Sequence, residues 1–86
     1  MFRLWGKIFR ENHLIKDQVI ERSDDTRTKR VFGAVDELCM SWDLGRPIWL
    51  DSNIKDFKKH AKTRFTQDNF IEPVDFDYLE IRIIEE

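Results

Sequence analysis

The side chains best suited to hold a metal ion are two histidines, His13 and His60, and a single cysteine, Cys39. None of them follows the Cys-x-x-Cys, His-x-x-x-His or His-Glu-x-x-His spacings, which place ligands on one face of one element. The three glycines are too scattered to form a phosphate-binding loop. The sequence therefore predicts no metal site and no bound cofactor.

Covalent catalysis would require a nucleophile next to a base. Cys39 lies at the edge of the apolar stripe of a predicted helix, where a buried thiol usually packs and does not react. A Cys39–His60 pair between two helices is geometrically conceivable, but no acidic residue is placed to orient His60. We favour packing for Cys39 and expect a protein that is not an enzyme.

Neighbouring carboxylates occur in three places. Asp24-Asp25 reads as a helix cap and Glu85-Glu86 as a solvated end. Asp75 and Asp77, on either side of Phe76, could share one face and hold a cation or act as acid and base. Because no further ligand accompanies them, we favour solvation.

The most specific charged surface consists of four lysines: Lys55, Lys58, Lys59 and Lys62. At 100° per residue they fall within about 100° of arc on one flank of a predicted helix. Such a flank fits contacts to phosphate groups and hence to nucleic acid. Two features argue against this function: the sequence pI is about 5.7, and the acidic segment 67–86 could neutralise the lysines.

Strict alternation of side chains over residues 2–9 and 14–21 predicts two strands that form a hairpin over residues 2–21. Asn12 tolerates the left-handed conformation that a tight turn requires. A two-residue loop at Glu11-Asn12 would place Leu4 beside Val19 on the core face and Phe9 beside Leu14 on the other.

Apolar residues recur at helical spacing in two segments. They are Val31, Val35, Leu38 and Trp42 in the first segment, and Ile54, Phe57, Ala61 and Phe65 in the second. We expect helices at about 25–43 and 52–64, the first capped by Ser23-Asp24-Asp25 and ended by the Gly45–Pro47 region. Alternation predicts a final strand at about 76–84.

The expected fold is α+β, with the order strand, strand, helix, helix, strand. A three-stranded antiparallel sheet with both helices packed on one face is the simplest arrangement, and the last strand most naturally pairs with the first. The other sheet face would then expose an apolar surface made of Trp5, Phe9, Leu14, Ile20 and Tyr78. Such surfaces mark association sites; the alternative is that the Trp49 connector or the 66–74 loop covers them.

Size and composition limit the class of protein. Eighty-six residues make a single small domain, 1–86, and one cysteine cannot form an intrachain disulfide. The chain has too many aromatic residues (13%) for a disordered tail and no apolar run long enough to span a membrane. No signal peptide is read at the amino terminus, so we expect a cytoplasmic protein. Its small core requires dense packing or self-association for stability.

Three stretches resemble a small family of uncharacterised bacterial proteins of similar length: Asp43-Leu44-Gly45-Arg46-Pro47-Ile48-Trp49-Leu50-Asp51, Arg64-Phe65-Thr66-Gln67-Asp68-Asn69-Phe70 and Phe76-Asp77-Tyr78-Leu79-Glu80. The resemblance implies a free-standing bacterial cytoplasmic protein. It implies no activity and no site residues, since the family has no assigned function.

We therefore expect a non-enzymatic module that binds a protein partner or a second copy of itself. The alternative is a nucleic-acid contact module that uses the lysine flank, and an enzyme built on Cys39 or His60 ranks third.

Overall fold

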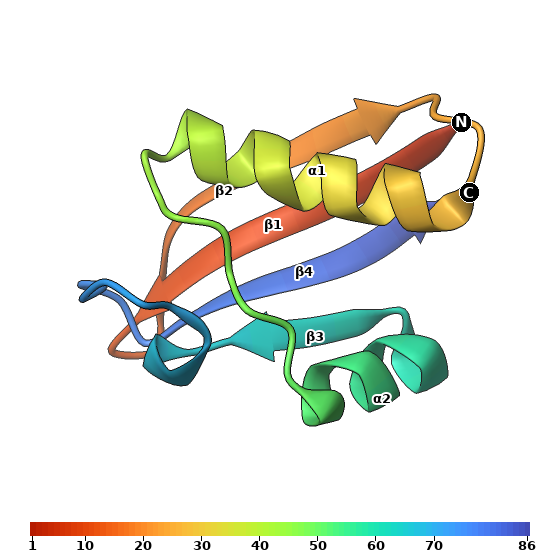
Figure 1. The fold of residues 1–86 in the computed structure, drawn as a ribbon. Coiled ribbons are helices and arrows are strands. Elements are labelled where there is room, and N and C mark those ends of the chain that lie inside the picture. The colour runs from red at the N-terminus through yellow and green to blue at the C-terminus, as the bar shows by residue number, and fades with distance from the viewer.

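The computed structural model describes all residues, 1–86, as an α+β fold with a four-stranded antiparallel sheet and two helices (Figure 1). The strands lie in the order β2-β1-β4-β3. The strands are β1 (Phe2–Arg10), β2 (His13–Arg22), β3 (Lys62–Phe65) and β4 (Tyr78–Glu85), and the helices are α1 (Arg27–Ser41), α2 (Asp51–His60) and the short 3-10 turn η1 (Gln67–Asn69). Helix α1 crosses β1 and β2, whereas α2 lies beside β3 (Figure 1). The predicted pairing of the first and last strands is confirmed.

The fourth strand, β3, corrects the prediction of three strands and of a helix over 52–64. Helix α2 ends at His60, because Ala61 adopts the left-handed conformation (φ 56°) and turns the chain back. The next residues pair with β4, with Thr63 opposite Ile81 and Phe65 opposite Leu79. Phe65 is fully buried, as the sequence pattern predicted, but it lies on strand β3 and not on a helix. The spacing of apolar residues therefore continues from α2 into β3 and does not indicate where the helix ends.

The hairpin contains the predicted turn and an unpredicted bulge. Glu11 and Asn12 both have positive φ, which a tight two-residue hairpin turn requires, and Phe9 pairs with Leu14 as expected. Ile15 is then an extra residue, because Ile8 pairs with Lys16. A one-residue shift moves every following side chain of β2 to the opposite face.

This shift corrects the expected position of Ile20. Leu4 pairs with Ile20 and Trp5 pairs with Val19. Ile20 is consequently buried in the core, and Val19 takes a place on the outer face.

Helix α1 is shorter at both ends than the predicted 25–43. Its N-cap is Thr26, whose side chain accepts a hydrogen bond from the Lys29 N–H at 3.2 Å. Asp24, predicted to cap the helix, instead binds the Arg22 guanidinium at 2.8 Å. At the other end the helix stops at Ser41, and Asp43 adopts positive φ just beyond it.

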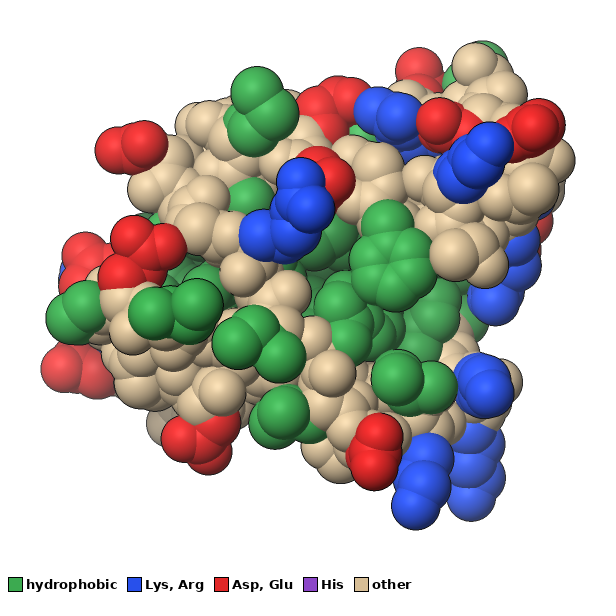
Figure 2. Space-filling model, in the orientation of Figure 1, with side chains coloured by type: hydrophobic (Ala, Val, Ile, Leu, Met, Phe, Trp, Pro, Cys, Tyr) green, Lys and Arg blue, Asp and Glu red, His purple; other side chains and the backbone are tan.

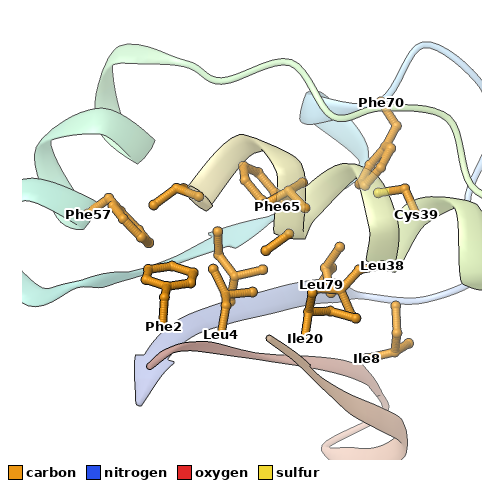
Figure 3. Packing of buried hydrophobic residues seen from close by; sticks show 14 residues of the cluster. Phe2, Leu4, Ile8, Ile20, Leu38, Cys39, Phe57, Phe65, Phe70 and Leu79 are labelled. Carbon is orange, nitrogen blue, oxygen red and sulfur yellow. The ribbon is translucent and has the colours of Figure 1, made fainter. Parts of the chain in front are cut away.

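The core lies between the sheet and the helices and contains fourteen buried apolar side chains. Figure 3 shows Leu38 and Cys39 of α1 on the same side of the sheet as Leu4, Ile20 and Leu79. The residues are Phe2, Leu4, Ile8, Ile20, Val31, Ala34, Val35, Leu38, Cys39, Phe57, Phe65, Phe70, Leu79 and Ile81. A Cβ at Gly6 would lie 2.5 Å from Leu38 Cδ1, so glycine permits α1 to approach β1 this closely.

Two buried asparagines, Asn53 and Asn69, join the irregular segments to the sheet; we call this pair the asparagine clamp. The Asn69 side-chain amide donates to the side-chain oxygen of Asn53 and to the Ile48 carbonyl, both at 2.7 Å. The Asn53 amide donates to the Thr63 hydroxyl and to the Arg64 carbonyl, both at 2.9 Å. The connector between α1 and α2 is therefore bonded to η1 at Ile48, and η1 is linked in turn to β3 through Asn53 of α2.

A candidate binding surface on the open sheet face

The sheet face opposite the helices carries alternate side chains from all four strands, and we call it the open sheet face. Its residues are Arg3, Trp5, Lys7 and Phe9 of β1; Leu14, Asp17, Val19 and Glu21 of β2; Lys62 and Arg64 of β3; and Tyr78, Glu80, Arg82 and Glu85 of β4. Both helices lie on the other side (Figure 1). The Trp49 connector and Phe70 of the 66–74 loop also pack against the core cluster. They do not cover the open sheet face.

A row of alternating charges crosses the middle of this face. Glu80 binds Lys7 Nζ through one oxygen at 2.9 Å and Arg64 Nε through the other at 3.1 Å. Burial of Glu80 opposes its ionisation, but the hydrogen bonds from these two cations outweigh it and lower the pKa of the carboxyl. At the other end of the row, Asp17 accepts a hydrogen bond from Trp5 Nε1 at 2.8 Å.

The aromatic rings of the open sheet face are half-buried beneath cations of the same face. Lys7 Nζ lies 4.0 Å from the centre of the Trp5 ring, and the Arg64 guanidinium lies 4.5 Å from that of Tyr78. Phe9 stacks on Tyr78 with ring centres 5.0 Å apart. The rings are therefore fixed in orientation before any partner binds.

The most exposed apolar side chains of this face lie on the edge strand β2. Leu14 is 48% exposed and Val19 is 43% exposed. The sequence pattern indicated Leu14, Trp5, Phe9 and Tyr78 and missed Val19, because nothing in the pattern marked Ile15 as the bulged residue.

The four predicted lysines are divided between two elements. Lys55, Lys58 and Lys59 are exposed on α2. Lys62 lies on β3 and points to the open sheet face, where it is opposite Arg82 of β4 in the strand register. This corrects the expectation of one continuous helical flank, because α2 ends before Lys62. None of the four lysines forms an ion pair, so no carboxylate of segment 67–86 binds them directly.

The residues considered for catalysis are not assembled into an accessible site. Cys39 is buried in the core, and burial raises the pKa of its thiol to about 11. His60 is exposed on α2. Asp77 accepts a hydrogen bond from the Glu11 backbone at 2.8 Å, and the Asp75 side chain is almost entirely exposed.

No group of three or more His, Cys, Asp or Glu side chains is arranged to hold a metal ion. Neither α1 nor α2 has the length and apolar character needed to cross a membrane. In comparisons with protein-family models, with curated proteins and with solved structures, the chain has no significant match.

Proposed function

We propose that the protein is a non-enzymatic binding module that contacts another protein through the open sheet face, with a second copy of the chain as the first partner to test. The observation that carries the proposal is that all four strands leave one face uncovered by any other element. On that face, Leu14 and Val19 offer apolar area beside aromatic rings of fixed orientation. Exposed apolar surface rimmed by polar groups is typical of association sites.

The charge pattern of the face favours a second copy as the partner. A symmetric dimer places one patch against itself, so each group must find its complement on the same surface. The row formed by Asp17, Lys7, Glu80 and Arg64 alternates in sign, and a two-fold arrangement can oppose unlike charges. Burial of the face would also add the support that a small core needs.

Sedimentation across the micromolar range tests this proposal with the wild-type chain and a Leu14→Glu variant. We expect a wild-type monomer–dimer equilibrium that Leu14→Glu weakens by about tenfold or more, because an unpaired carboxylate would be buried at the interface. Ile71→Glu is the matched control, since Ile71 is 90% exposed in the loop before β4. A wild-type chain that stays monomeric throughout this range would contradict self-association.

Nucleic-acid contact through Lys55, Lys58 and Lys59 remains the alternative function. The exposure of these lysines and their lack of ion pairs support it. In a gel-shift assay at low salt, charge reversal of all three to Glu should abolish binding of single-stranded RNA and duplex DNA. The control is Lys29→Glu, because Lys29 already pairs with Asp25. An unshifted wild-type chain would show that these lysines are only solvated.

The non-enzymatic part of the proposal rests on the inaccessibility of Cys39. A thiol reagent should label Cys39 only as the chain unfolds, because the thiol is buried and almost fully protonated at neutral pH. Labelling of the folded chain as fast as of the unfolded chain would revive the Cys39 hypothesis. A single cysteine also fits a reducing compartment, and we retain the cytoplasm of a bacterium as the proposed location.

A further inference from the structure

An apolar groove lies between α1 and α2, on the side of the sheet opposite the open sheet face. Its volume is about 180 Å³. Figure 2 shows hydrophobic side chains gathered in the hollow between the two helices. The groove is lined by Val31, Phe32, Trp49, Ile54 and Phe57, with Arg27, Thr28 and Lys58 at its polar rim.

The groove is formed before any ligand binds. Trp49 lines the groove and meets Phe32 edge-on at 5.3 Å and Phe57 edge-on at 5.5 Å between ring centres. The asparagine clamp holds the connector that carries Trp49. Phe32 and Ile54 nevertheless remain 45% and 40% exposed, one on each helix. Two helices thus present apolar side chains to a shared hollow that the protein itself leaves unfilled.

The size of the groove selects the kind of occupant. Pockets for drug-sized ligands start at about 300 Å³, and this groove is smaller and open. It has room for one bulky apolar side chain, and binding interfaces commonly depend on a few anchors of this kind. The dimensions favour a protein segment over a small molecule.

The charge at the rim selects the sequence around that anchor. Arg27 already binds a carboxylate, that of Glu86, at 2.9 Å. Lys58, also at the rim, and its exposed neighbour Lys55 form no ion pair. An acidic segment would find free cations on the α2 side and could exchange with Glu86 on the α1 side.

We propose that this groove binds a short acidic segment of a partner protein, which inserts one bulky apolar side chain between Phe32 and Ile54. Carboxylates on either side of the anchor pair with Lys58 and Arg27. The site is independent of the open sheet face, because the two lie on opposite sides of the sheet.

The three tryptophans make the test specific, since Trp49 lies in the groove, Trp5 on the open sheet face and Trp42 just past the end of α1. The full-length ¹⁵N-labelled chain is titrated with a synthetic peptide that has a central leucine flanked by glutamates. Two further peptides replace the leucine by alanine or the glutamates by lysines. We expect a saturable shift of the Trp49 indole N–H with the first peptide, and affinity about tenfold lower or worse with each of the others.

Lys58→Glu and Lys59→Glu form a matched pair of variants, because the two residues are neighbours on α2 and only Lys58 lines the groove. Lys58→Glu should weaken binding of the acidic peptide by about tenfold, and Lys59→Glu should leave it within about twofold. Equal binding of the lysine peptide would overturn the proposal, as would a response at Trp5 in place of Trp49. If the Trp49 indole signal shifts with protein concentration alone, without peptide, the groove binds a second copy of the chain. If the signal shifts only when RNA is added, the groove binds nucleic acid. Either result would overturn the acidic-segment proposal without affecting the proposed function of the open sheet face.

Discussion

At the scale of single residues, Glu80 organises the open sheet face. It is buried at the centre of the charge row and binds both Lys7 and Arg64. Lys7 is itself only 13% exposed, so its ammonium group has little water to replace a lost partner. The Glu80 carboxylate therefore stabilises the cations that in turn cover the aromatic rings of Trp5 and Tyr78.

The substitution Glu80→Gln should lower the free energy of unfolding by about 1–3 kcal/mol at pH 7. Because the folded pKa of Glu80 is lowered, its contribution is present above the unfolded pKa of about 4.3 and is lost as the pH falls through the folded value. The wild type and the variant should thus converge in stability at acid pH in chemical denaturation. Glu85→Gln on the same strand is the control, since Glu85 is half-exposed. A stability difference that persists unchanged at acid pH would contradict this role.

Asn53 is a second single residue on which the fold depends, because its side chain forms hydrogen bonds with several buried groups. Asn53→Ala should destabilise the fold by about 2–4 kcal/mol, since the Leu50 N–H, the Asn69 amide and the Thr63 hydroxyl all lose their partner. Thermal and urea denaturation measure the loss. Ser52→Ala, at an exposed neighbouring position without a side-chain hydrogen bond, should stay within about 0.5 kcal/mol of wild type. Equal stability of the two variants would show that the clamp contributes little.

At the scale of the elements, the sequence predicted those whose apolar period was unbroken. The alternation in β1 and β4 and the helical period of α1 each identified an element and its buried face. In α2 the period identified the helix and the buried Phe57, but it also assigned to the core Ile54, which is exposed, and to the helix Ala61 and Phe65, which lie beyond its end. Strand β3 was missed because its four residues begin one residue after α2, and the residue between them is alanine and not glycine. A non-glycine residue in the left-handed conformation leaves no signal in the sequence.

The candidate site was predictable to a similar degree. Trp5, Phe9 and Tyr78 are on the outer face because they lie on strands whose register with their neighbours follows the alternation. Ile20 was predicted on the wrong face, because the alternation of side chains does not reveal the bulge at Ile15 that shifts the register of β2. The groove requires two helices at a particular separation, and no single segment contains that information.

Ala61 offers a direct test of how α2 ends. Ala61→Gly should raise the free energy of unfolding by about 0.5–1 kcal/mol, because glycine adopts positive φ without the steric cost that a Cβ incurs. Ala34→Gly provides the contrast: Ala34 is buried in the middle of α1, and its replacement should cost about 1 kcal/mol or more. Denaturant titration measures both. A destabilised Ala61→Gly variant would mean that α2 does not end at this residue.

At the scale of the whole molecule, the chain has a strongly held part and a weakly held part. Strands β1 and β4 lie in the centre of the sheet, and α1 buries five residues over it. Helix α2 buries only Asn53 and Phe57 and contacts mainly the short edge strand β3. The two proposed surfaces lie on opposite faces of this molecule, so both can be occupied at once.

Native-state hydrogen exchange should resolve these two parts. We expect the amides of α2 and β3 to exchange through an opening that costs less free energy than the global unfolding that exposes β1 and β4. Ile71→Glu, at a position that is 90% exposed in the loop before β4, is the control that should leave the difference between the two parts unchanged. A single free energy of exchange for all protected amides would show that the molecule opens only as a whole.

The asparagine clamp has a further consequence, for cleavage by proteases. Extended surface segments are normally the first to be cut, and the chain has two of them, one before α2 and one between η1 and β4. The first is bonded to Asn69 through both the N–H and the carbonyl of Ile48, and these hydrogen bonds must break before the segment can enter a protease. The second includes Ile71, whose side chain is 90% exposed, and Gln67 bonds this segment at the Glu72 carbonyl and the Val74 N–H. A protease of broad specificity should therefore cut the folded chain near residue 71 and leave two fragments that stay associated.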